Sequence, residues 1–273
     1  MTTFILLHGS FHAAWNWHKV LPLIEQAGHH GIALDMPGHG HDSTAPRHVS
    51  LDACVDRVVE TLDRCGDAVL VAHSRNGIVI SQAAERRPDR IGGLVYLAAY
   101  MVPHSRTMME YAVTDTESLV LQNSTAKLSV QWLPRLVRWL RRPMLRWLAM
   151  QLLPRAWQVH TLRRCVYREA LYHDCPSEIT ELANVLLEPE PHWPGFTPLH
   201  LTAARYGSVP RVYIECKDDR AVTPALQRRM RDDSPGAHCV SLQSGHSPFF
   251  SQPERLVEVL CESLTHFPAL RAT

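Results

Sequence analysis

Three short segments carry the side chains that a hydrolytic triad requires. Ser74 stands in Val-Ala-His-Ser-Arg-Asn-Gly after one strand candidate, Asp218 and Asp219 follow a later one, and His246 follows a third. A histidine that accepts the serine proton, oriented by an acid, makes the hydroxyl a nucleophile toward carbonyl carbon. The residue types and their order therefore indicate acyl chemistry through a covalent serine intermediate.

The segment around Ser74 departs from the usual pattern of a serine at a strand-to-helix turn. That pattern, Gly-x-Ser-x-Gly, uses glycine because the strand and the helix approach closely, and Ala72 and Asn76 take both glycine positions here. Asn76 must point away from the strand or fill a gap. An ordinary serine that starts a helix is the alternative, and the ordered acid and histidine favour the nucleophile.

A candidate oxyanion hole lies at the end of the first apolar run, which reads Leu-His-Gly-Ser-Phe from position 7. The backbone N–H groups of Ser10 and Arg75 could both point at the carbonyl oxygen of a substrate. Ser74 would then attack while these two groups hold the negative charge that develops on the oxygen.

Continuous apolar runs predict the strands that must position these residues. The runs cover residues 4–7, 32–34, 68–72 and 94–98, and runs without polar alternation suit parallel strands that are covered on both faces. Residues 212–214 and 239–242 are two further strand candidates. Helical patterns lie between them, with Ser50 and Thr223 as predicted N-caps. Ligands bind at the carboxyl ends of such strands, where all three catalytic candidates fall.

The alternation of strands and helices is interrupted once, which predicts an α/β fold with an insertion. We expect a mainly parallel sheet, with a helical cap inserted after the fourth strand. The core would comprise residues 1–102 and 207–273, and the cap residues 103–206. The cap is expected to be wholly helical, with short helices starting at Pro134, Pro143 and Pro154.

Several segments, distributed over nearly the whole chain, resemble those of a known family. They are residues 4–15 (Phe-Ile-Leu-Leu-His-Gly-Ser-Phe-His-Ala-Ala-Trp), 27–29, 33–38, 95–100, 206–216 and 245–246. The chain resembles the plant-type methylesterase and hydroxynitrile lyase branch of the α/β-hydrolase superfamily, which has bacterial esterase relatives that include pyrethroid-hydrolase-like enzymes. Residues 127–164 resemble nothing in that family. The resemblance implies the α/β-hydrolase fold.

The resemblance also implies roles for single residues. It places the nucleophile on Ser74, the base on His246, the acid on Asp219 rather than Asp218, and the oxyanion donors on Ser10 and Arg75. Lyases of the family carry Thr or Asn where this chain has glycine at position 9, and some carry Lys where it has Ser247. The resemblance therefore implies ester hydrolysis rather than cyanohydrin cleavage.

Composition excludes several other classes of protein. The chain has 273 residues, with 28 basic and 27 acidic side chains and a net charge of +1, which argues against a dedicated nucleic-acid binder. It contains neither the ~18-residue apolar run of a membrane span nor a signal-peptide pattern. Its seven cysteines form no CxxC pair, so we expect a cytoplasmic protein with reduced thiols.

Histidine is abundant, and His39-Gly40-His41-Asp42 matches part of a metallohydrolase motif. The fuller motif needs another histidine where Ser43 stands, so we expect no metal site. No cofactor is expected either.

The predicted cap is basic in its first half. Residues 118–168 contain nine Arg and one Lys without a single acid, together with four of the seven Trp. Three interpretations stay open: a lid with solvated Arg heads, a surface that binds anionic membranes, and an acceptor for an acidic partner such as a carrier protein.

We therefore predict a serine hydrolase that cleaves a small, fairly apolar carboxylic ester. Phe11, His12, Phe249 and the cap tryptophans are candidates for the pocket walls. The same triad would also serve an acyltransferase, a thioesterase or a lactone-forming cyclase of secondary metabolism, with a carrier-bound acyl chain as one candidate substrate. A hydroxynitrile lyase and a non-catalytic ligand receptor are the remaining alternatives.

Overall fold

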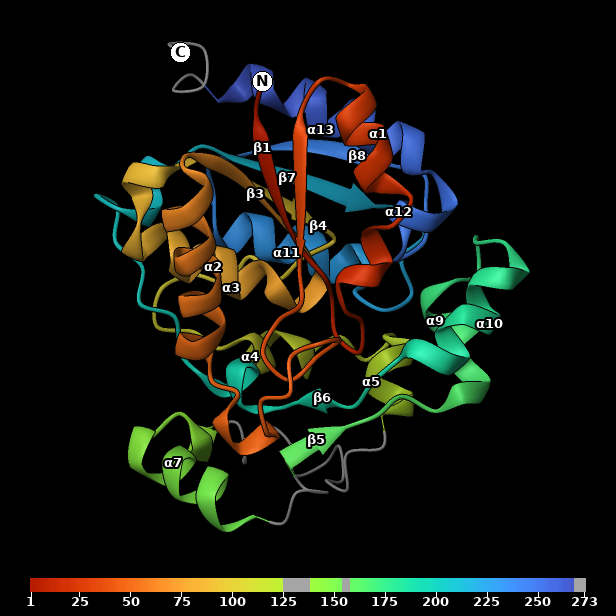
Figure 1. Ribbon diagram of the computed structural model, residues 1–273. Coiled ribbons are helices and arrows are strands. Elements are labelled where there is room, and N and C mark those ends of the chain that lie inside the picture. Colours follow the sequence, from red (N-terminus) through yellow and green to blue (C-terminus); the bar gives the residue numbers. More distant parts are fainter. Residues whose placement is uncertain (125–137, 154–157, 268–273) are drawn as a thin grey trace.

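The computed structural model describes residues 1–124, 138–153 and 158–267. These residues form a six-stranded sheet in the order β2-β1-β3-β4-β7-β8, in which every ladder is parallel (Figure 1). The strands are β1 (Thr3–Leu7), β2 (His30–Leu34), β3 (Ala68–His73), β4 (Ile91–Leu97), β7 (Arg211–Cys216) and β8 (Ala237–Leu242). The parallel sheet predicted from these six segments is thus confirmed.

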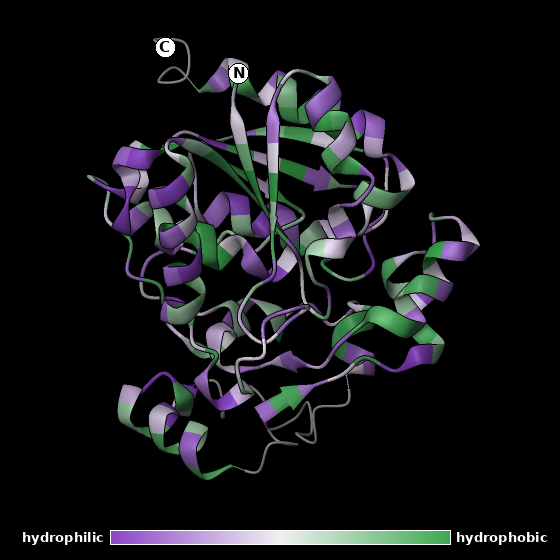
Figure 2. Ribbon diagram, in the orientation of Figure 1, coloured by the Kyte–Doolittle hydropathy of each residue, from purple (hydrophilic) through white to green (hydrophobic). Residues whose placement is uncertain are grey.

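Helices cover both faces of this sheet. They are α1 (Val20–Gln26), α2 (Leu51–Cys65), α3 (Gly77–Arg86), α11 (Pro224–Asp233), α12 (Pro248–Ser251) and α13 (Pro253–Ser263). Helices α2, α3 and α11 pack on one face, and α1 and α13 on the other. Figure 2 shows hydrophobic strands in the middle of these layers.

Alternate side chains of each strand supply the two cores, as the strand period of two requires. In β1, Ile5 and Leu7 join the core beneath α2 and α3, whereas Phe4 and Leu6 join the core beneath α1 and α13. All four are completely buried, which explains why the run carries no polar alternation.

The predicted helix caps are present. The side chain of Ser50 accepts a hydrogen bond from Ala53 N (3.1 Å) at the start of α2, and that of Thr223 accepts one from Leu226 N (3.4 Å) at the start of α11. Each satisfies a backbone donor that the first helical turn leaves unpaired.

The inserted segment lies over the carboxyl ends of the strands (Figure 1). Its described helices are α4 (Met108–Ala112), α5 (Leu119–Asn123), α7 (Pro143–Leu152), α9 (Tyr167–Leu171) and α10 (Ser177–Leu186). Pro143 starts α7 as predicted, whereas Pro134 and Pro154 lie outside the described residues. The boundaries of core and cap stay a prediction.

The cap is not wholly helical, so that expectation was wrong. Strand β5 (Val159–His160) pairs antiparallel with β6 (Glu190–Pro191). Two residues per strand leave no periodic pattern in a sequence, and Pro191 in β6 is compatible only with an edge position. This short ladder therefore forms through contact between distant segments.

No helix in the described part of the chain is long and apolar enough to cross a membrane.

Candidate active site

Ser74 sits in a strained turn at the end of β3. It begins a 3-10 turn, Ser74–Asn76, that leads into α3. Ser74 has a φ of 54°, in the left-handed region that costs a non-glycine residue on the order of 1 kcal/mol. Its carbonyl accepts a hydrogen bond from Tyr100 N (2.9 Å), which ties the turn to the loop after β4.

Asn76 fills the gap that the usual glycine would leave. It is completely buried, and its Nδ2 donates a hydrogen bond to the carbonyl of His8 (2.6 Å). The backbone segments approach each other closely at the next residue instead, because a Cβ on Gly77 would stand 2.5 Å from Tyr100 O. The strand-to-helix turn at Ser74, here called the elbow, therefore lacks the usual glycines and gains a direct link to the loop after β1.

That loop approaches the elbow at Gly9. A Cβ at this position would stand 2.5 Å from His73 Nδ1 and 3.0 Å from Ser74 Cβ, closer than side chains tolerate. Gly9 thus lets Ser10, the next residue, reach the cavity beside Ser74.

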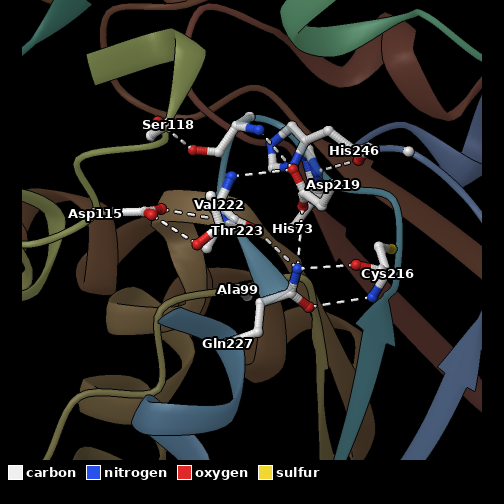
Figure 3. A network of polar contacts seen from close by, with 12 residues as sticks. His73, Ala99, Asp115, Ser118, Cys216, Asp219, Val222, Thr223, Gln227 and His246 are labelled. Atoms are coloured by element: carbon white, nitrogen blue, oxygen red, sulfur yellow. Dashed lines mark hydrogen bonds and ion pairs between the residues drawn. The ribbon is translucent and has the colours of Figure 1, made fainter. Parts of the chain in front are cut away.

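The predicted acid and base are in contact. His246 Nδ1 lies 2.7 Å from Asp219 Oδ2, and both residues are buried. Asp219 Oδ1 accepts hydrogen bonds from Ala221 N (2.7 Å) and Val222 N (3.0 Å). The carboxylate is therefore held on both oxygens, with one of them directed at the imidazole (Figure 3).

Gln227 supports this loop from α11, a role that the sequence did not suggest. It is completely buried, and its Nε2 lies within hydrogen-bond distance of Asp219 Oδ2 (3.3 Å) and Val222 O (2.7 Å). Its Oε1 accepts from Cys216 N (3.1 Å). The signal available in the sequence was a polar side chain, Gln227, on the apolar face of the helix predicted after Thr223.

His73 connects His246 to β3, the strand that precedes Ser74 (Figure 3). The two rings lie 4.3 Å apart, and His73 Nε2 lies 2.9 Å from the carbonyl oxygen of His246. Burial, followed by the neighbouring His246, lowers the pKa of His73 well below its ordinary value. His73 is therefore neutral and donates from Nε2 to that carbonyl.

Ser74 and His246, although both are described, share no hydrogen bond in this structure. Such contacts are commonly long in the absence of substrate. The structure thus joins His246 to Asp219 and brings it beside the residue that precedes Ser74.

A cavity opens at Ser74 between the core and the cap. Ser10, Phe11, Ser74 and Arg75 line it from the core. Most of its other lining residues are apolar: Tyr100, Met108, Met109, Ala112, Val120, Leu121, Leu171, Pro191, Phe196, Ala221 and Val222. Such a mixture suits an apolar ligand with one reactive polar group.

Of the three pocket candidates, only Phe11 lines this cavity. Phe249 is completely buried and packs edge-on against His73 (4.9 Å between ring centroids). His12 lies behind the wall, with Nδ1 2.7 Å from Ser10 O and Nε2 2.6 Å from the Tyr172 hydroxyl. Both fill space beneath the site, His12 from the turn after Ser10 and Phe249 from α12.

None of the cap tryptophans that are described lines the cavity. Trp139 and Trp147 are exposed, and Trp132 and Trp157 lie outside the described residues. The cap instead contributes His160 and His192, whose Nδ1 atoms are 3.0 Å apart. Burial and mutual proximity lower the pKa of His160 to about 3, and burial lowers that of His192 to about 4.

The histidines of the partial metallohydrolase motif have other partners. His39 Nε2 lies 3.3 Å from Glu190 Oε2, and His41 Nδ1 lies 2.9 Å from Asp35 Oδ2. Among the described residues, no group of three or more His, Cys, Asp or Glu side chains could hold a metal ion.

The comparisons with known proteins agree with this architecture. The model of the alpha/beta hydrolase family matches residues 4–259. Methylesterase 1 of Arabidopsis thaliana is 29% identical over 93% of this chain and 92% of its own. The pyrethroid hydrolase of Sphingobium wenxiniae is 30% identical over 96% of this chain and 87% of its own.

A solved structure is similar over nearly the same length. The pyrethroid hydrolase of Sphingobium faniae has a TM-score of 0.78 and 26% identity, and the match covers 96% of both chains. Some relatives are longer, and the chain spans 65% of a chloroplastic relative from Arabidopsis thaliana. The resemblance inferred from the sequence is confirmed. These relatives also confirm the prediction of an ester-hydrolysing type of enzyme. The chain belongs to the alpha/beta hydrolase family.

Proposed function

We propose that the protein is a serine hydrolase that cleaves a small, fairly apolar carboxylic ester. The observation that carries this proposal is the buried pair of Asp219 and His246 (2.7 Å) next to a strained serine that lines an apolar cavity. The methylesterases and pyrethroid hydrolases among its relatives support the ester class.

In the proposed mechanism, His246 accepts the proton of Ser74 as Oγ bonds to the ester carbon. The electron pair of the carbonyl moves onto its oxygen, where the N–H groups of Ser10 and Arg75 stabilise the charge. The proton then passes to the departing alcohol, which leaves an acyl-enzyme. Water, deprotonated by His246, cleaves this intermediate and restores Ser74. Asp219 holds the imidazole and stabilises its positive form.

The alternatives differ in what they require at defined positions. A lyase-type Thr or Asn at position 9 would need space that the His73 ring occupies, which favours hydrolysis. Acyl transfer, thioester cleavage and lactone formation use the same triad. Thioester cleavage differs from ester hydrolysis in its leaving group, a thiol. In acyl transfer and lactone formation an alcohol or an amine captures the acyl group in place of water, so exclusion of water by the cap is the deciding variable there.

The test is Ser74→Ala with a p-nitrophenyl ester and a fluorophosphonate probe. Turnover and labelling should both disappear in the variant. Ser105→Ala is the matched control, because Ser105 is exposed and also has a positive φ (62°). Wild-type protein that neither turns over the ester nor takes the label would favour a ligand receptor. Products formed with an added alcohol would reveal acyl transfer.

The basic cap as a surface for an acidic carrier protein or an anionic membrane stays a proposal, as does the cytoplasmic location. Arg138 and Arg142 are exposed, beside the exposed Trp139 and Trp147. Arg146 instead donates to Phe196 O (3.3 Å) inside the cap. The test is therefore charge reversal at Arg138 and Arg142 alone. It should weaken the salt-sensitive binding of a carrier-bound substrate.

A further inference from the structure

A carboxylate from the cap reaches the floor of the site. Glu190, in β6, is completely buried. Its Oε2 accepts a hydrogen bond from Phe11 N (2.8 Å), and its Oε1 forms an ion pair with Nη1 of Arg75. Arg75 Nη1 also donates to the carbonyl of Pro191 (3.1 Å), so both neighbours in β6 bind the same guanidinium.

The order of the sheet explains why one carboxylate can contact three loops. Strands β2, β1 and β3 are adjacent, and parallel strands end at the same edge. His39 follows β2, Phe11 follows β1 and Arg75 follows β3. His39 Nε2 lies 3.3 Å from Glu190 Oε2, so Glu190 contacts the loops of all three strands.

The contact is a strong constraint because water does not compete for it. Arg75 is 2% exposed and Glu190 is not exposed at all. Among the described residues, Glu190 is the anion that pairs with Arg75. Burial alone would raise the pKa of the Glu190 carboxyl, yet the Arg75 guanidinium and His39 lower it below its ordinary value. The carboxyl is thus ionised, and a buried charge without its partner would be costly.

The two groups that Glu190 holds, the Arg75 guanidinium and Phe11 N, adjoin the donors of the candidate oxyanion hole. Arg75 supplies one predicted N–H, and Phe11 directly follows Ser10, which supplies the other. Phe11 has a φ of 68°, a conformation that surrounding contacts must impose. Misplacement of such donors weakens only interactions with the charged oxygen.

We propose that Glu190 is a positioning residue that aligns the N–H groups of Ser10 and Arg75, so that the cap completes the oxyanion hole. This inference rests on the proposed serine hydrolase. It assigns to the cap a part in the chemical step, in addition to its part in covering the cavity.

The experiment compares Glu190→Gln, Arg75→Met and the double variant with wild-type protein. Glu85→Gln is the matched control, because Glu85 is a buried carboxylate that likewise accepts from a backbone amide (Thr202 N, 2.8 Å). Rates on a p-nitrophenyl ester are normalised to the number of Ser74 sites labelled at completion by a fluorophosphonate. Inhibition is measured with a trifluoromethyl ketone, which forms an oxyanion with Ser74, and with the matching methyl ketone as an intact carbonyl.

We expect kcat to fall about 10- to 100-fold in Glu190→Gln, with KM changed less than about threefold. The trifluoromethyl ketone should lose affinity by the same factor as kcat, and the methyl ketone should keep its affinity. The double variant leaves no unpaired buried charge, so it should regain thermal stability while its kcat stays low. Glu85→Gln should keep the kcat of the wild type.

Two results would overturn the inference. One is a double variant whose kcat recovers together with its stability, because the pair would then be only structural. The other is an equal loss of affinity for both ketones. If wild-type protein does not hydrolyse the ester at Ser74, the proposed function fails instead, so the two failures can be told apart.

Discussion

Asp219 contacts His246 through one carboxylate oxygen, 2.7 Å from Nδ1, while its other oxygen accepts two backbone N–H groups. Asp218, its neighbour in the chain, is exposed and accepts a hydrogen bond from Gln243 (2.6 Å). One position in the loop thus separates an acid that orients the imidazole from one that contacts solvent.

Asp219→Asn should lower kcat about 10³- to 10⁴-fold, because the amide cannot stabilise the charged imidazole and favours the wrong tautomer. Asp218→Asn, the adjacent isosteric change, should leave kcat unchanged. Steady-state kinetics on a p-nitrophenyl ester distinguish the two. Equal effects of both substitutions would remove Asp219 from the proposed mechanism.

Asn76→Gly restores the glycine of the usual elbow, yet it should destabilise this protein. The change removes the buried hydrogen bond from Nδ2 to His8 O and leaves a cavity, at a cost of about 1–3 kcal/mol. Chemical denaturation monitored by fluorescence measures the free energy of unfolding. A stability equal to or above that of the wild type would show that the Asn76 contact adds nothing.

Gly9→Ala should reduce kcat by about 10²-fold or more, because its methyl group would collide with the His73 ring and displace Ser10. Gly28→Ala is the control. A Cβ at Gly28 meets nothing within 4 Å, although its φ is +79°, so only a backbone cost of about 1 kcal/mol is expected. Full activity in Gly9→Ala would contradict the close approach.

Stability should fall steeply as the pH is lowered from 6.5 to 4. Burial, the largest cause in each case, lowers the pKa of His8 and His160 to about 3 and that of His12 and His192 to about 4. Their ordinary value is 6.5, so the unfolded chain binds protons in this window that the folded chain does not. Their contribution is complete above pH 6.5 and is lost as the pH falls toward each folded value.

Each of these histidines contributes up to about 1.4 kcal/mol per pH unit within its window. Denaturation curves between pH 7 and pH 4.5 should therefore show uptake of several protons on unfolding. His12→Gln should reduce that uptake by about one proton. A free energy of unfolding that stays constant over this range would mean that these histidines are already charged in the folded protein.

The sequence by itself determined the strands of the core. Runs such as residues 4–7 have no polar alternation because each strand is covered on both faces, and this local property can be read without knowing any partner. The order of a serine, an acid and a histidine could be read in the same way, since each follows its own strand. The residues alone left the acid open between Asp218 and Asp219, and the family resemblance selected Asp219. The caps at Ser50 and Thr223 also depend on neighbours only three residues away.

The tertiary structure decided which distant groups meet. Glu190 and Arg75 are 115 positions apart, and Asn76 contacts a carbonyl 68 positions away, so neither contact has a periodic signal. His12 and Phe249 were expected in the cavity wall but lie behind it, because the direction of a side chain depends on how its segment packs against the rest of the fold. Sequence patterns report whether a residue is buried, whereas the order of the strands decides which loops, and therefore which charges, share one site.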